Sequence, residues 1–64
     1  PISKENVRTG DVVFSKEGGR LYTVIENKKG LLGGRMLLES PRGGQIEIKE
    51  SDYDKFTFHR KNDI

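Results

Sequence analysis

Few side chains in this sequence of 64 residues are of the types that catalyse reactions or hold metals. His59 is the only histidine and cysteine is absent, so the chain lacks both a set of soft metal ligands and a thiolate nucleophile. Asp52 and Asp54 are close in sequence, but on a helical turn their carboxylates point apart, and helix capping explains them better. We interpret His59 as a solvent-facing residue of an edge strand. The sequence therefore predicts a protein that is not an enzyme and has no catalytic residue, metal or cofactor.

Two glycine clusters raise the question of a phosphate-binding loop. A P-loop joins a strand to a helix and ends in Gly-Lys-Ser or Gly-Lys-Thr, whereas KEGGRL (Lys16–Leu21) joins two expected strands and lacks that ending. GLLG (Gly30–Gly33) matches the Gly-x-x-Gly of KH domains by letter, but no helix is expected on either side of it. We therefore interpret both clusters as turns.

Basic side chains beside these turns form the first candidate binding site. The residues are Lys16, Arg20, Lys28, Lys29 and Arg35, with Tyr22 as an aromatic neighbour that can stack on a base. If the two turns occupy neighbouring parts of one rim, these cations converge and neutralise several phosphates of a nucleic acid. The other interpretation is that the charges only solvate the loops, because Glu17 and Glu26 lie among them and the net charge is only +2.

A leucine pair within KKGLLGG (Lys28–Gly34) forms the second candidate site. Leu31 and Leu32 either fold back over the core or stand in solvent, where an apolar pair marks a partner surface. In the second case they bind a protein partner, together with an aromatic rim that includes Tyr53.

Alternating apolar residues and eight glycines predict an all-β domain that spans residues 1–64. The expected strands are residues 11–15, 20–27, 35–40, 45–49 and 55–59. They are joined by a turn at 16–19, a loop at 28–34, a turn at 41–44 and one helical turn at 51–54. Ser51 is expected to cap that helical turn. Ile46 and Ile48 are expected to point inward, and Phe56 and Phe58 to share one face.

This order of elements resembles the SH3-like small barrel. The segment VRTGDVVFSKEGGRLYTV (Val7–Val24) is similar to the first half of KOW-type barrels, in which a Gly-Asp pair precedes the first strand and a glycine turn precedes the second. The resemblance implies a five-stranded SH3-like barrel with one short 3-10 turn before the last strand. It also implies a non-enzymatic binding module that recognises nucleic acid as an accessory factor, of the kind that bacteria and phages make. The alternative is a protein-binding adaptor or inhibitor.

One enzyme family is built on the same barrel. LLESPRGGQIEIKESDYDKF (Leu37–Phe56) is similar in layout to the type II dihydrofolate reductases, whose tetramer lines a pore with a Val-Gln-Ile-Tyr strand. Gln45 and Ile46 match the middle two positions, but Gly44 stands in place of the valine and Glu47 in place of the tyrosine. An acid in a pore that accepts anionic NADPH is electrostatically unfavourable, so the resemblance does not extend to the activity.

Chain length and hydropathy set the remaining expectations. A domain this small buries only about 60% of its extended surface, so its core is small, and self-association to form a homo-oligomer stays open. No apolar run approaches the roughly 20 residues that span a bilayer, and we expect a cytoplasmic protein with no membrane partner. Pro1 is consistent with removal of an initiator methionine.

Overall fold

The computed structural model describes residues 2–3, 5–30 and 33–63, with the side chains of residues 29 and 30 left out. Five antiparallel strands form one sheet in the order β4-β3-β2-β1-β5. Their bounds are β1 (Val12–Ser15), β2 (Arg20–Gly30), β3 (Gly33–Glu39), β4 (Gln45–Lys49) and β5 (Phe56–Arg60). A 3-10 helix, η1 (Glu50–Lys55), connects β4 to β5. The prediction of an all-β fold with one short 3-10 turn before the last strand is confirmed.

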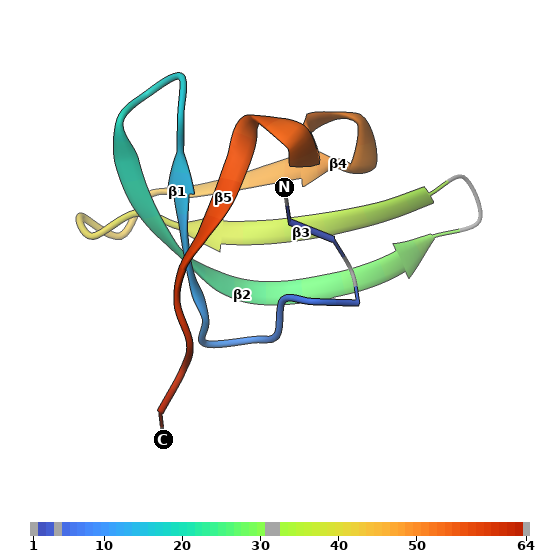
Figure 1. Cartoon of the computed structure of the whole chain (residues 1–64), viewed down its shortest axis with the longest axis horizontal. Helices are drawn as coiled ribbons and strands as arrows, with labels where there is room; N and C mark the ends of the chain where they lie inside the picture. The colour runs from blue at the N-terminus through green and yellow to red at the C-terminus, as the bar shows by residue number, and fades with distance from the viewer. Residues whose placement is uncertain (1, 4, 31–32, 64) are drawn as a thin grey trace.

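The sheet is bent but not closed (Figure 1). β4 and β5 are its two edges, and η1 crosses between them. The word barrel therefore applies only loosely. The bend lies in β2, where the register with β3 shifts between Val24 and Glu26 and leaves Ile25 as an extra residue. A bulge of this kind increases the local twist and redirects the strand.

The core lies on one face of the sheet, which we call the inner face. Val13, Val24, Met36 and Leu38 come from the three central strands and are the most deeply buried side chains. Phe56, Ile48 and the N-terminal Ile2 and Val7 join them, and η1 adds Tyr53. Each fully buried aliphatic side chain contributes about 1.5–3 kcal/mol to folding. This small cluster is the main source of stability in a chain without disulfides.

Two glycines shape the turns at one end of the sheet. Gly19 ends the β1–β2 turn with a φ of 64°, and Gly43 lies in the β3–β4 turn with a φ of 94°. Both angles are in the left-handed region, which a side chain at Cβ disfavours. The expectation that these glycines form turns is confirmed.

The expectation of a loop is wrong for residues 28–30 and 33–34, which belong to strands. β2 continues to Gly30 and β3 begins at Gly33, with Lys28 opposite Arg35 and Gly30 opposite Gly33. The segment carries few apolar groups, so side-chain alternation does not reveal it, whereas backbone pairing needs no apolar side chain. Leu31 and Leu32 lie outside the described residues.

Of three smaller expectations, the inward direction of Ile46 and the shared face of Phe56 and Phe58 are confirmed, and capping by Ser51 is wrong. Ile46 and Phe58 do lie on the inner face, opposite Leu38 and Val13, but 39% and 48% of their surfaces are exposed. Both belong to edge strands, so no further strand covers them. Ser51 lies inside η1 and does not cap it; instead a carboxylate oxygen of Asp52 accepts the Lys49 N–H at 3.3 Å.

Candidate anion-binding site

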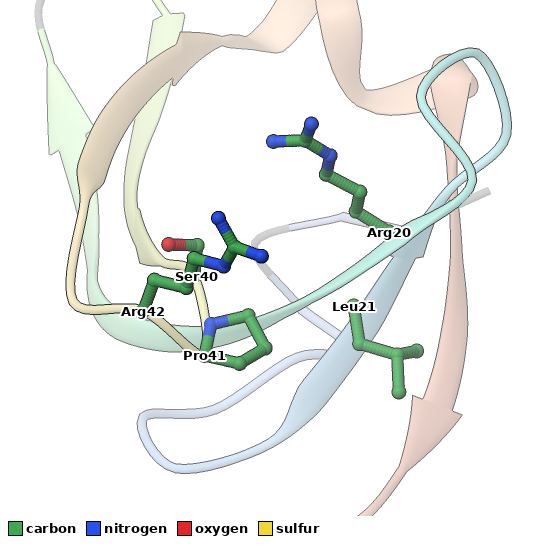
Figure 2. A pocket seen from close by; sticks show the side chains of 5 residues that line it. All are labelled: Arg20, Leu21, Ser40, Pro41 and Arg42. Carbon is green, nitrogen blue, oxygen red and sulfur yellow. The ribbon is translucent and has the colours of Figure 1, made fainter.

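The β1–β2 and β3–β4 turns lie at the same end of the sheet (Figure 1), and each brings one arginine there. Arg20 is the first residue of β2, and Arg42 lies in the β3–β4 turn. A pocket of about 370 Å³ separates them, and Leu21, Ser40 and Pro41 complete its lining. Figure 2 shows both guanidinium groups pointing into the same space from opposite sides.

Strand register determines the direction of Arg20. Its partner in β1 is Ser15, whose other neighbour is Phe56 of the core. Directly opposed residues share a face, so Arg20 projects from the inner face beyond the end of the core. The turn that ends with the Gly18-Gly19 pair therefore places a cation at the first inner-face position of β2. The next inner-face residue along the strand, Tyr22, already packs against the core.

Hydrogen bonds at Ser40 hold Arg42 in place. The Ser40 N–H donates to the Gly44 carbonyl at 2.7 Å, and the Gly43 N–H donates to the Ser40 carbonyl at 2.9 Å. The Ser40 Oγ accepts the Gly44 N–H at 3.1 Å. Pro41 further restricts the backbone immediately before Arg42. The turn is thus ordered by its own polar groups, and the Arg42 side chain is presented from a defined backbone.

Neither arginine has an acidic partner in the described part of the chain. The ion pairs found there join Lys28 to Glu26, Arg35 to Glu47 and Lys55 to Asp52. Two cations that face one pocket without a counter-charge raise its positive potential and favour an anion. Guanidinium groups are suited to phosphate and carboxylate because each offers paired N–H donors in one plane.

The predicted cluster of five cations does not form. Lys16 and Arg20 lie at one end of β2, while Lys28 and Arg35 lie near the other, at the tip of the β2–β3 hairpin (Figure 1). Arg20 and Lys28 are eight residues apart on one strand, up to about 26 Å along its path. Lys28 and Arg35 each have a glutamate within ion-pair distance, at 3.7 and 3.9 Å. The side chain of Lys29 lies outside the described residues.

The two tyrosines predicted to contact ligands have mainly structural positions. Tyr22 is half-buried and packs edge-to-face against Phe56, with ring centroids 6.2 Å apart. We expected Tyr53 to present a surface to a protein partner. This expectation is wrong, because Tyr53 is only 5% exposed. Burial, and then the nearby charge of Glu50, raise the pKa of the Tyr53 hydroxyl. Both rings therefore belong to the core or pack against it.

Sequence reasoning missed Arg42, which lies within a segment that we interpreted only as a turn. It placed Phe58 on one face with Phe56, as the structure does, but did not name it as a site residue. The signals available were an arginine between Pro41 and Gly43, and an alternation that places a second phenylalanine, Phe58, in the last expected strand. Neither signal reveals which residues of other elements lie near these two side chains in the folded protein.

Other site types find no support within the described ranges. The described residues contain no cluster of three or more metal-ligating side chains. No helix in the described residues is long and apolar enough to cross a membrane. His59 is exposed on the edge strand β5, as expected. No family model, curated protein or solved structure matches this sequence.

Proposed function

We propose that this chain is a non-enzymatic module that binds nucleic acid by holding backbone phosphate between Arg20 and Arg42. The observation that carries the proposal is the convergence of two guanidinium groups, neither with an acidic partner in the described residues, on one pocket. The resemblance to KOW-type barrels over residues 7–25 supports the same class of ligand. In this proposal the pocket replaces the five-residue rim as the main phosphate contact.

The test is direct binding of short labelled oligonucleotides, followed by fluorescence anisotropy at about 50 and 200 mM salt. Each charge-assisted hydrogen bond is worth about 1.5–3 kcal/mol, so Arg20→Ala and Arg42→Ala should each weaken binding at least about tenfold. If two phosphates are neutralised on a single strand, the slope of log affinity against log salt is about −1.4.

Arg35→Ala is the matched control for this test. It removes the same charge from another exposed arginine, one that already has Glu47 as a partner at the opposite end of β2. The proposal requires Arg35→Ala to bind almost as well as the unmodified chain. Equal losses for all three variants would mean that binding follows net charge alone, and no binding at low salt would remove the proposal.

A protein-binding adaptor is the second candidate, and exposed apolar groups on the edge strands favour it. Phe58 and Ile46 are 48% and 39% exposed on β5 and β4. Aromatic residues and arginine are both enriched at protein interfaces. A pull-down from nuclease-treated lysate with the unmodified chain and with Phe58→Ser tests this candidate. A partner that survives nuclease and is lost with Phe58→Ser supports it, and a partner lost on nuclease treatment counts against it.

A further inference from the structure

We infer that the ligand is a single strand, and that Phe58 stacks an unpaired base beside the Arg20–Arg42 pocket. This inference rests on the proposed function and specifies which form of nucleic acid the site takes. It comes from the part of the inner face that the core leaves uncovered. Arg20, Ile46 and Phe58 are exposed on this face, and Arg42 of the β3–β4 turn lines the same pocket as Arg20.

Phe58 is the most exposed large apolar side chain in the described residues, with 48% of its surface open. Its neighbour Phe56, two residues earlier on the same face, is buried. The difference arises because Phe56 is adjacent to η1 and Tyr22, whereas Phe58 lies farther along the edge strand. An exposed aromatic ring on an edge without a neighbouring strand has its face available to a ligand.

The register places Phe58 on the same face as Arg20. Phe58 is opposite Val13, and Val13 is opposite Tyr22. The adjacent row on this face contains Phe56, Ser15 and Arg20. Two strand spacings and one two-residue step therefore separate the Cα atoms of Arg20 and Phe58, about 12 Å in a regular sheet. One short oligonucleotide can span this distance, with its phosphate in the pocket and a base on Phe58.

The combination of groups distinguishes a single strand from a duplex. In a duplex the bases are stacked on one another, so an exposed ring meets only sugar, phosphate and base edges. In a single strand each base has a free face, and stacking on an aromatic ring stabilises the complex irrespective of sequence. Arginine alone would serve either form, so the exposed position of Phe58 is what selects the single strand. The expected preference is for unpaired bases with little sequence specificity.

The experiment uses the full chain and three probes of about 12 nucleotides: an oligothymidine, an abasic strand with the same phosphates, and a duplex. Phe58→Leu keeps an apolar group without a ring, and Phe58→Tyr keeps the ring. At this exposure neither change should affect folding, and the melting temperature of each variant verifies that. We expect Phe58→Leu to lose roughly tenfold in affinity for oligothymidine and little for the abasic strand, while Phe58→Tyr binds normally.

The outcomes separate this inference from the proposed function. If no probe binds, the proposed function is wrong. If duplex or abasic strand binds as tightly as oligothymidine, or Phe58→Leu has no effect while Arg20→Ala and Arg42→Ala do, only the single-strand inference is overturned. If a polyglutamate of equal charge displaces oligothymidine with equal potency, the site takes acidic chains in general, and the inference is likewise overturned.

Discussion

Asp11 is the one charged residue that is buried in the described part of the chain, with 4% of its surface exposed. One carboxylate oxygen accepts the Arg8 N–H at 2.9 Å, and the other accepts the Asn62 N–H at 2.8 Å. The first bond closes the loop before β1, and the second holds the segment after β5. These N–H donors, that of Asn62 first, stabilise the charged form and lower the pKa of Asp11. Asp11 therefore connects two ends of the chain around the sheet.

Replacing Asp11 by alanine should destabilise the fold by about 2–4 kcal/mol, because two N–H groups lose a charged acceptor. In a domain of this size that loss lowers the melting temperature by more than about 10 °C. Thermal unfolding followed by circular dichroism measures it. Asp63→Ala, which removes an exposed carboxylate from the same terminal segment, is the control and should change stability little. A loss below half a kcal/mol at Asp11, on the order of a surface substitution, would contradict this role.

The lowered pKa of Asp11 also predicts how stability depends on pH. The folded-state pKa lies below the ordinary value of 3.8, so the unfolded chain binds the proton first as the pH falls. The stabilisation is complete above that ordinary value and is lost as the pH falls through the folded-state pKa. Urea unfolding between pH 6 and pH 2, about the range of acid denaturation, should show a steeper decline for the unmodified chain than for Asp11→Asn. Parallel curves would show that Asp11 is not the group responsible.

Tyr53 presents the opposite case, a buried hydroxyl without a hydrogen-bond partner in the described structure. Tyr53→Phe removes that unsatisfied group, so we expect unchanged stability or a gain of up to about 1 kcal/mol. Because burial raises the pKa of Tyr53 above 10.0, the unfolded chain ionises first, and the contribution of Tyr53 falls as the pH rises past that value. Tyr53→Phe should lack this alkaline component. Urea unfolding at neutral and alkaline pH tests both statements, and a marked destabilisation at neutral pH would reveal a missed partner.

At the scale of elements, η1 is fixed to β3 through Gly34. The Gly34 N–H donates to a Glu50 carboxylate oxygen at 3.0 Å. A Cβ added at Gly34 would lie 2.9 Å from the Tyr53 hydroxyl oxygen, closer than side chains normally approach. The absence of a side chain at this strand position is therefore what lets η1 pack onto the sheet and bring Tyr53 into the core.

This contact predicts a coupling between Gly34 and Tyr53. Gly34→Ala should destabilise the protein by about 1–3 kcal/mol, as overpacking usually does. In the Tyr53→Phe background the obstructing oxygen is gone, so the same substitution should cost at least about 0.5 kcal/mol less. A double-mutant cycle with urea unfolding measures the difference. Additive effects would show that the clash is relieved by some other movement.

Much of this fold follows from local sequence patterns, and the errors occur where local patterns carry little information. VVF and the glycines at 18–19 and 43–44 are sufficient to predict β1 and the two turns that follow β1 and β3. Lys28 and Arg35 pair across a hairpin through backbone groups alone, so their segment was interpreted as a loop. Arg20 was predicted as a site residue, but Arg42 was not, because their convergence depends on which turns share an end of the sheet. Which turns share an end of the sheet is set by the order of all five strands and cannot be read from a short segment.

For the whole molecule, the charge distribution matters more than the net charge of +2. Cations at the hairpin tip have glutamates beside them, whereas Arg20 and Arg42 face each other with no such partner in the described residues. In the proposed function, a bound phosphate relieves the like-charge repulsion between these two side chains. Binding to the folded state alone must raise stability in proportion to ligand occupancy. The proposed function therefore predicts that ligand binding at this end of the sheet raises stability.

The last prediction uses this linkage. With oligothymidine at about 100 times its dissociation constant, the folded state gains about 2.7 kcal/mol, which raises the melting temperature by ~10–20 °C. Arg42→Gln removes one cation from the pocket, so its melting temperature without ligand should equal or slightly exceed that of the unmodified chain, because the repulsion with Arg20 is relieved. The same oligothymidine concentration should then raise it far less. Arg35→Gln, with the same change in net charge outside the pocket, should keep the full increase. Differential scanning fluorimetry at low salt distinguishes these cases. If both glutamine variants lose the ligand-induced increase in melting temperature equally, binding depends on overall charge and the proposed pocket is wrong.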